Sequence, residues 1–328
     1  MTGFRMMVAG LAAGLVLVAA QAHAADYKLR LHTLVKSPHP YNDMANYMKT
    51  ELAAKSGGKI EVQIFDAGQL GQDPAVLGEM GLGTIDLIVS STSNAVKQVP
   101  EFQVFSMPYL FSGLDDVMAR VGPGSKAEAY FQKVYADRKL GIQLLALGVA
   151  GARNMANSEK PVTALADISG MKMRTPPSAL MSKSWAALGT IPVQIAWGEL
   201  YAAVQTGVAQ GLEASLPGYS GAKLYEVAPY LAMTGHEMQV DHISISDRAW
   251  KKLPADLQAL MLKTAQEAAV IGKEKADQYD SELVEELKAK YKVTVTTPDV
   301  GQFQAALKSL QVELAQELKL TDALNSLQ

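Results

Sequence analysis

The sequence predicts an α/β protein made of two lobes, with one long helix that braces both. Three observations lead to this prediction. Strand-like and helix-like patterns alternate through residues 28–89, the alternation returns after residue 140, and the segment after Pro254 runs to about Tyr291 without proline. Alternating strands and helices are typical of a sheet covered by helices, so two separate sets of them indicate two such units.

The first set of elements lies between residues 28 and 89. Residues 28–34 alternate as a strand does, and residues 41–55 carry apolar side chains at helical spacing before the stop at Gly57 and Gly58. Beyond this helix we expect a strand at 59–65, a turn at 68–73, a helix at 74–82 and a buried strand at 85–89. This succession is the one expected of a parallel sheet.

The second set begins at residue 140. We expect strands at 140–147, 172–174 and 212–214, and helices at 178–188 and 199–206. The resulting division of the chain assigns residues 25–150 and about 240–279 to lobe I, and residues 151–239 and about 280–328 to lobe II.

The segment after Pro254 is dense in Ala, Leu, Glu, Lys and Gln and contains one glycine, Gly272. At about 1.5 Å per residue, a continuous helix over 255–291 would be more than about 50 Å long, which exceeds the width of one lobe. We therefore expect it to brace both lobes. The alternative is a pair of helices broken near Gly272, because an internal glycine weakens a helix.

The N-terminus has the pattern of an export signal. Arg5 precedes an uncharged apolar run at 6–20 that is too short to span a bilayer, and Gln-Ala-His-Ala at 21–24 has the small residues that signal peptidase prefers. We expect cleavage after Ala24 and a periplasmic mature chain that begins at Ala25. The alternative is an uncleaved membrane anchor.

The composition argues against several classes of function. The 328-residue chain has a formal net charge of −3, which becomes −4 when the signal takes away Arg5 and no acidic residue. No basic stripe interleaved with aromatic residues is present, so nucleic acid is not expected as a partner. Cysteine is absent, so the exported protein must depend on buried apolar cores for its stability.

Motifs for catalysis or for metal and cofactor binding fail on inspection. Gly122-Pro123-Gly124 is not preceded by a strand, and the serine of the GYSG segment at 218–221 misses the spacing of a nucleophile elbow by one position. No two histidines stand four residues apart, and the cluster of acids and histidines at 236–242 is expected to lie along a strand. We therefore expect no enzyme, no metal and no cofactor.

Two arginines are the strongest candidates for ligand binding. Arg153 follows Gly151 after a predicted strand, and Arg174 ends a strand shortly before Pro176. Ligands of α/β proteins bind at such carboxyl ends of strands. The guanidinium group is planar and permanently charged, and it can hold a carboxylate by two parallel hydrogen bonds. The alternative for each arginine is a structural ion pair with a neighbouring acid.

Several segments carry a family likeness, namely DAGQLG at 66–71, GARNMAN at 151–157, DISGMKMR at 167–174 and ELYAAVQTG at 199–207. In this order they resemble the DctP-type solute-binding proteins of TRAP (tripartite ATP-independent periplasmic) transporters, and the likeness extends over nearly the whole mature chain. The resemblance implies a type II-like, two-lobed periplasmic binding protein that closes over an organic acid.

The resemblance also implies roles for particular residues. In the family, the arginine that matches Arg174 pairs with the substrate carboxylate, and the arginine that matches Arg153 often assists it. An aromatic side chain walls the pocket at the position where this chain has Trp197. We therefore expect all three side chains to contact the ligand.

Two further features concern the ligand. The family usually has Glu-Asn where this chain has Glu213 and Ala214, so Glu213 stays a candidate ligand residue and Ser215 or a neighbour must replace the missing amide. In the first lobe, Ser91 and Asn94 belong to a neutral run of hydroxyl and amide groups, which suits ligand hydroxyl, keto or second carboxylate groups. The alternative for this run is a polar turn or helix cap.

The resemblance implies capture of a small organic acid anion by a monomeric protein, and its delivery to a membrane permease of small and large subunits. The sequence leaves open whether the acid is a dicarboxylate, a hydroxy or keto acid, or a sugar acid. Two other functions also stay open at this point. One is a binding protein that feeds a chemoreceptor or sensor kinase, and the other is an exported hydrolase or lyase of organic acids.

Overall fold

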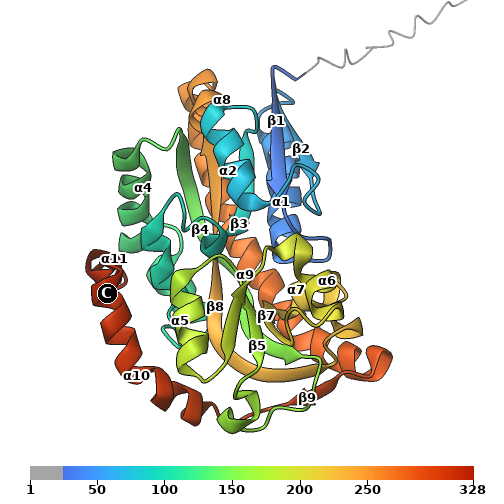
Figure 1. Cartoon of the computed structure of the whole chain (residues 1–328). Helices are drawn as coiled ribbons and strands as arrows, with labels where there is room; N and C mark the ends of the chain where they lie inside the picture. Colours follow the sequence, from blue (N-terminus) through green and yellow to red (C-terminus); the bar gives the residue numbers. More distant parts are fainter. Residues whose placement is uncertain (1–24) are drawn as a thin grey trace, which may run out of the picture.

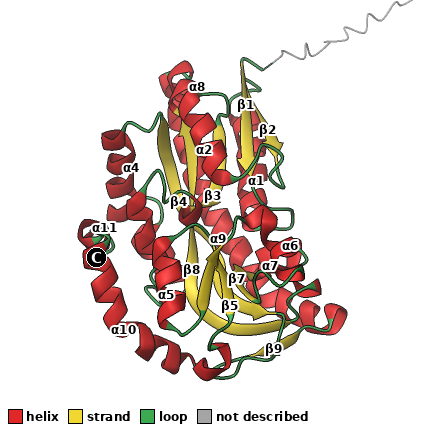
Figure 2. Cartoon of the chain, in the orientation of Figure 1, coloured by secondary structure: helices red, strands yellow, loops and turns green. Residues whose placement is uncertain are grey.

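The computed structural model describes residues 25–328, so the predicted signal peptide at 1–24 lies outside the described residues. Two α/β lobes are joined by strands and a helix that run through both (Figures 1 and 2). The strands are β1 (Tyr27–Thr33), β2 (Ile60–Phe65), β3 (Leu87–Ser91), β4 (Ile142–Asn157), β5 (Lys172–Thr175), β6 (Ile191–Gln194), β7 (Gly211–Ser215), β8 (Tyr230–Ser246) and β9 (Thr294–Thr296). The helices are α1 (Pro40–Lys55), α2 (Asp73–Leu82), α3 (Leu114–Val121), α4 (Lys126–Arg138), α5 (Ala179–Ala187), α6 (Leu200–Gln205), α7 (Leu216–Gly221), α8 (Asp247–Lys252), α9 (Ala255–Tyr291), α10 (Val300–Glu317) and α11 (Thr321–Ser326).

The predicted elements are present, and most of their ends differ from the prediction by one or two residues. Helix α1 begins after His39, whose ring Nδ1 accepts a hydrogen bond from the backbone N–H of Tyr41. Pro40 occupies the first helical position, where a missing N–H costs nothing. Helix α2 likewise begins with an acid and a proline, Asp73 and Pro74.

All strands of the described chain belong to one mixed sheet, in the order β2-β1-β3-β8-β4-β7-β5-β6, with β9 beside β8. The outer pairs, such as β1 with β3 and β5 with β7, are parallel, as predicted. The predicted parallel arrangement of residues 28–89 is confirmed for β1, β2 and β3. The sheet as a whole is mixed, since strands β4 and β8 are antiparallel to each other and to their neighbours β7 and β3. The reason is that β4 and β8, of 16 and 17 residues, cross both lobes in opposite directions.

Strand β4 continues well beyond its predicted end at residue 147. Its register with β8 shifts between Val149 and Ala152, where Gly151 has a φ of 114°. Because glycine tolerates this left-handed conformation, the strand bends at this point without ending. Arg153 therefore lies inside a strand, whereas the prediction placed it after a strand end.

Helix α9 is one continuous helix of 37 residues and not two. Its first part buries Ala265 and Ala268 in the core that α1 and β3 share, and its last part buries Leu283 and Leu287 in the core around α7 and β7. The helix thus contributes to both lobes, as predicted. Gly272 lies in the interior of this helix, where α1 packs closely against it. A Cβ at this position would come within 2.7 Å of the Met44 sulfur on α1, so glycine allows the close contact.

The residue boundaries of the lobes stay a prediction, with one correction at the C-terminus. Phe303 and Leu307 of α10 pack in a lobe II core with Met173. In contrast, Leu314 and Leu320 pack in the lobe I core with helix α4. Residues 280–328 therefore do not belong to lobe II alone, because the apolar face of α10 is long enough to reach both lobes (red in Figure 1).

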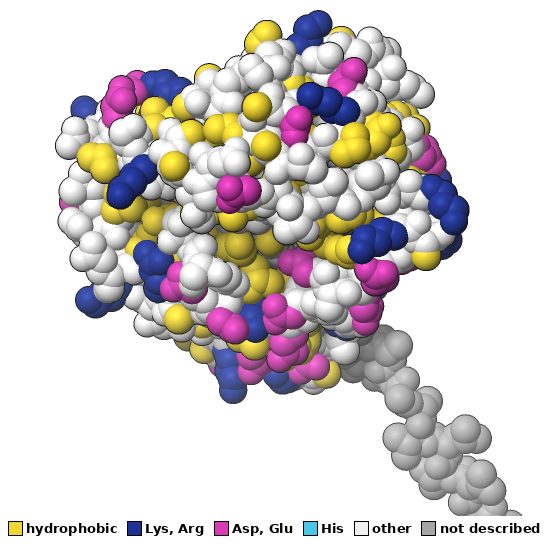
Figure 3. Space-filling view, turned by 90° about the horizontal axis from the view of Figure 1, so that it is seen from below, with side chains coloured by type: hydrophobic (Ala, Val, Ile, Leu, Met, Phe, Trp, Pro, Cys, Tyr) yellow, Lys and Arg dark blue, Asp and Glu magenta, His cyan; other side chains and the backbone are white. Residues whose placement is uncertain are grey.

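The surface seen from below carries charges of both signs, which are interspersed and form no continuous basic stripe on this face (Figure 3). Within residues 25–328, none of the helices combines the length and the apolar character that a membrane span requires.

The packing of α9 on α1 leads to a prediction for Gly272. We expect Gly272→Val to lower the free energy of unfolding by about 1–3 kcal/mol, because the added methyl groups overpack the contact with Met44. As a control, Gly78→Ala on α2 places a Cβ where no atom lies within 4 Å, and it should raise stability by about 0.5–1 kcal/mol through helix propensity. Urea unfolding of residues 25–328 measures both, and unchanged stability of Gly272→Val would contradict the packing argument.

Candidate ligand-binding site

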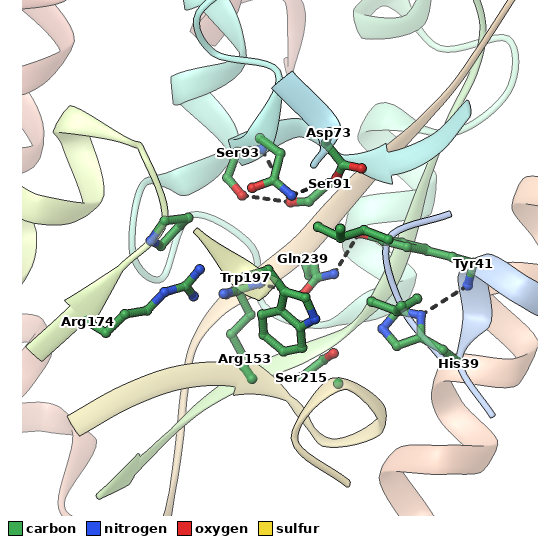
Figure 4. A pocket seen from close by; sticks show the side chains of 16 residues that line it. His39, Tyr41, Asp73, Ser91, Ser93, Arg153, Arg174, Trp197, Ser215 and Gln239 are labelled. Carbon is green, nitrogen blue, oxygen red and sulfur yellow. Dashed lines mark hydrogen bonds between the residues drawn. The ribbon is translucent and has the colours of Figure 1, made fainter. Parts of the chain in front are cut away.

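A pocket lies between the two lobes, and both contribute to its walls (Figure 4). Lobe I supplies the loop after β1, the start of α1, the first residue of α2 and the turn after β3. Lobe II supplies residues of β5, β7 and the segment around Trp197, and the long strands β4 and β8 supply Arg153 and Gln239. The space between the walls measures about 440 Å³ including its open mouth.

Arg174 lines the pocket from strand β5, with its guanidinium group directed into the cavity (Figure 4). Only 1% of the residue is exposed, and its Nε donates to the carbonyl of Ile195 at 2.9 Å. Its Nη1 has no hydrogen-bond partner among the described residues and lies 3.9 Å from the Glu213 carboxylate. Burial lowers the pKa of Arg174 to about 10, so the group stays charged at neutral pH with a donor unused.

Arg153 lines the same pocket but gives its donors to the protein. Its Nε donates to the Glu213 carboxylate, its Nη2 to the Glu213 carbonyl at 3.2 Å, and its Nη1 to the side-chain oxygen of Gln239 at 2.5 Å. Burial by itself would lower the pKa of Arg153, but the paired Glu213 carboxylate raises it above its ordinary value. The hydrogen bonds therefore hold Arg153 in place, and the carboxylate of Glu213 balances its positive charge.

Glu213 lies behind the two arginines and is not among the residues that line the pocket. Its side chain is fully buried, and His236 Nε2 lies 3.8 Å from its carboxylate. Burial favours the protonated acid, but the charge of Arg153 and the hydrogen bonds outweigh it and lower the pKa of Glu213 to about 2. The expectation that Glu213 contacts the ligand is therefore wrong, because strand β7 directs its side chain toward Arg153.

The rest of the lobe II wall has little polarity. Trp197 begins a short 3₁₀ turn (Trp197–Glu199), and its ring centroid lies 5.8 Å from the Arg174 guanidinium carbon. Ala214 and Ser215 line the pocket at the end of β7, as does Gly218 in α7. Ala214 has no polar side chain, so Ser215 supplies the only side-chain hydroxyl of this group within the described wall.

The lobe I wall is a polar cluster at the end of β3. The hydroxyl oxygens of Ser91 and Ser93 are 2.8 Å apart, and Ser91 also caps the turn that follows, so its roles as cap and as pocket wall coexist. Asn94 donates from Nδ2 to the Asp73 carboxylate at 2.8 Å. The predicted run of hydroxyl and amide groups is thus present, but the wall as a whole is not neutral, because Asp73 also lines the pocket.

Sequence reasoning missed four lining residues with polar side chains: His39, Tyr41, Asp73 and Gln239. Gln239 accepts from Arg153 and donates to the Tyr41 hydroxyl at 2.7 Å, so it links lobe II to α1. Burial and the nearby Arg153 lower the pKa of His39 to about 3, so this ring is neutral. For His39, the helix start at Pro40 was an available signal, whereas nothing local distinguishes Gln239 from other polar residues of a long strand.

Strand β8 carries further buried titratable groups behind the pocket. The residues at 236–242 lie along this strand, as predicted. Glu237 lies 3.9 Å from Arg153, whose positive charge lowers the pKa of the acid. Burial has the larger effect and raises this pKa to about 8. Glu237 is therefore mostly protonated at neutral pH, and Glu213 alone supplies the negative charge that holds Arg153.

These features define a class of protein, a two-lobed binding protein with a cationic pocket between its lobes. Over residues 31–317 the sequence matches the bacterial extracellular solute-binding proteins of family 7, the DctP family. The chain belongs to this family. Its members are periplasmic solute-binding proteins of TRAP transporters and not enzymes.

Similarity to known proteins, in sequence and in structure, supports the family assignment and the fold. The uncharacterized protein y4mM of Sinorhizobium fredii is 32% identical over 79% of this chain, which spans about half (47%) of that protein. A TRAP periplasmic solute-binding protein from a Bordetella species, with density interpreted as pantoate, is 28% identical with a TM-score of 0.85, over 92% of this chain and 98% of that one. Another from Roseobacter denitrificans, with bound β-D-glucuronate, is 28% identical with a TM-score of 0.82, over 92% and 99%. These structures confirm the predicted two-lobed fold.

The depressed pKa of Glu213 leads to a prediction for acid stability. A carboxylate whose pKa falls from 4.5 to about 2 on folding stabilises the native state above pH 4.5 and loses this contribution as the pH falls toward 2. Glu213→Gln should therefore be less stable than the wild type at pH 7, by an amount on the order of 3 kcal/mol, and the difference should shrink in that acid window.

The measurement is the urea midpoint of both proteins at pH 7, 4.5 and 3. Glu285→Gln serves as the control, since this side chain is 78% exposed and should alter neither the midpoint nor its pH dependence. Equal acid sensitivity of Glu213→Gln and the wild type would show that the pair with Arg153 is not what lowers the pKa of Glu213.

Proposed function

We propose that this protein captures a small hydroxy acid or sugar acid anion in the periplasm and delivers it to a TRAP-type membrane permease. The observation that carries the proposal is the buried Arg174, whose Nη1 has no partner among the described residues. A buried, unpaired guanidinium donor is costly, and a carboxylate is the group whose two oxygens match its fork. A ligand carboxylate would complete the set of interactions around Arg174.

The remainder of the pocket supports a ligand with hydroxyl groups. Ser91, Ser93 and Asn94 offer hydroxyl and amide groups on the lobe I wall, and the Tyr41 hydroxyl, which accepts from Gln239, keeps its own proton to donate. Pantoate and glucuronate, the ligands of the two compared structures, each combine one carboxylate with hydroxyl groups. A ligand of this chemical type would match both walls.

The proposed roles follow from the contacts. Arg174 pairs with the carboxylate, and Arg153, held in place by Glu213, contributes a second positive charge at the same side of the pocket. Trp197 closes the pocket with its ring beside Arg174. Ser215 and the lobe I cluster of Ser91 and Asn94 contact the polar groups of the ligand.

Export and delivery complete the proposal. Residues 1–24 act as a signal peptide that is cleaved after Ala24, and the monomeric mature chain docks on the small and large membrane subunits when its lobes have closed over the ligand. Membership of the TRAP solute-binding family supports this step. The ligand contacts both walls only when the lobes are closed. Because it makes more contacts in the closed form than in the open form, it shifts the equilibrium between them toward closure.

Replacing Arg174 tests the capture step. We titrate residues 25–328 with pantoate, D-erythronate, D-gluconate and D-glucuronate and follow the melting temperature and the heat of binding. One of these anions should raise the melting temperature in proportion to the logarithm of its concentration, and Arg174→Met should weaken its binding on the order of 100-fold. Arg174→Lys should fall in between, since lysine keeps the charge but lacks the planar fork.

The control is Arg138→Ala, because Arg138 pairs with Glu101 on the surface of lobe I and lies outside the pocket. This variant should bind like the wild type. Binding that is indifferent to Arg174, or no binding of any carboxylate, would refute the proposed capture.

Uptake by cells tests the delivery step. In a strain that lacks this chain, uptake of the anion identified above should be lost and should return when the full-length protein is supplied, but not when the Arg174→Met variant is. Unchanged uptake together with a lost chemotactic or transcriptional response to the anion would instead support a sensory role.

A further inference from the structure

Asp73 is a buried acid on the pocket wall that the carboxylate capture described above does not use. It is the first residue of α2, and it is fully buried. It lines the pocket from lobe I, whereas Arg174 lines it from lobe II, and the two side chains lie well apart across the cavity (Figure 4). The pocket therefore has a cationic side and an anionic side.

The hydrogen-bond partners of the Asp73 carboxyl group are all able to act as donors. Its Oδ2 accepts from the Ser90 hydroxyl at 2.5 Å and from Asn94 Nδ2 at 2.8 Å, and its Oδ1 lies 3.0 Å from His32 Nε2. Each of these partners can donate, so none requires a proton on the acid. The arrangement is that of a carboxylate held in place by donors.

This carboxylate has no cation to balance it within residues 25–328. No Lys or Arg lies within ion-pair distance, and His32 is its one basic neighbour. The Nδ1 atom of His32 is buried without a partner, so Nε2, which faces Asp73, is the ring nitrogen that makes the hydrogen bond. Asp73 therefore lies at the far side of the pocket from Arg174 with no lysine or arginine of the described residues beside it.

Of the two arginines that line the pocket, only one has a donor without a partner among the described residues. Arg153 gives its donors to Glu213 and Gln239, so Arg174 is the remaining arginine with a free donor on the described wall. A ligand with one carboxylate finds that donor. A ligand with a second carboxylate at its other end finds no second free cation and approaches the charge of Asp73 instead.

We propose that Asp73 makes this pocket selective for monocarboxylates that bear hydroxyl groups, and that it excludes dicarboxylates of the same length. The proposal rests on the proposed capture of an organic acid and narrows its class. A hydroxyl at the far end of the ligand donates to the lone pair that Asp73 Oδ1 has left, while Asn94 and Ser91 contact its neighbours. A carboxylate at that position cannot donate, and it brings two like charges together where little water screens them.

Matched pairs of ligands test this selectivity. Each pair has the same carbon chain, with a terminal hydroxymethyl group in one member and a carboxylate in the other: D-erythronate with meso-tartrate, pantoate with 3,3-dimethylmalate, and D-gluconate with D-glucarate. Calorimetric titration of residues 25–328 at pH 7.5 gives the ratio of affinities. For the pair whose monocarboxylate binds best, we expect the dicarboxylate to bind roughly 100-fold more weakly or worse.

Asp73→Asn then identifies the residue responsible. This variant keeps the size of the side chain and removes its charge, so the dicarboxylate should gain at least about tenfold in affinity while the monocarboxylate changes by only a few fold. Asp115→Asn is the matched control, since it makes the same change in net charge at a side chain that is 93% exposed and should leave the ratio unaltered. Asp73→Ser is the second variant if Asp73→Asn does not fold, and it should shift the ratio in the same direction.

The possible outcomes separate the two proposals. If no member of any pair binds, or if binding ignores Arg174, the proposed capture fails and this inference fails with it. If a monocarboxylate binds through Arg174 but its dicarboxylate partner binds equally well, or if Asp73→Asn leaves the ratio unchanged, only this inference is overturned. Ectoine, which carries a cationic ring beside its carboxylate, is the last probe, and tighter binding of ectoine than of every hydroxy acid would overturn the assignment of a hydroxyl to Asp73.

Discussion

The pocket depends on one buried ion pair, between Arg153 and Glu213. Two guanidinium groups are buried side by side in this region, and a charge removed from water must be compensated by charge or hydrogen bonds. Glu213 pairs directly with Arg153 but lies 3.9 Å from Arg174, so it compensates the first fully and the second only in part. Arg174 is therefore charged, fixed by the Ile195 carbonyl and still short of a partner, and this is the property that makes it a receptor for an anion.

The strands that carry this pair also join the lobes. Strand β4 passes from the cores of lobe I at Val149 to those of lobe II at Met155, and its bend at Gly151 lies between them. Helix α9 runs beside it and is buried in both lobes. Next to Trp197, the N–H of Gly198 donates to the Gln72 side chain of lobe I at 3.2 Å. Contacts of this kind stabilise a closed arrangement, and a ligand that contacts both walls adds to them.

A chain of polar groups links the two lobes through the pocket. It runs from Glu213 through Arg153 and Gln239 to the Tyr41 hydroxyl on α1. Because each member is buried and hydrogen bonded, the network holds its side chains in one orientation before any ligand binds. The donors that remain are few and lie in defined places, which is how a small pocket gains specificity without a large apolar surface.

Most of the elements, including the long helix α9, could be predicted from the sequence, because burial of one face leaves a periodic pattern of apolar residues along the chain. Family motifs also placed Arg174, Arg153 and Trp197 at the pocket. The mixed sheet could not be predicted in this way, since strand direction depends on the pairing of β4 with β8, which are far apart in the chain. The tertiary structure also decided the roles of Glu213, Gln239 and Asp73. A polar residue in a strand or at a helix start carries no local sign of which cavity or charge it faces, and only the assembled sheet turns Glu213 toward Arg153 and Asp73 toward the ligand space.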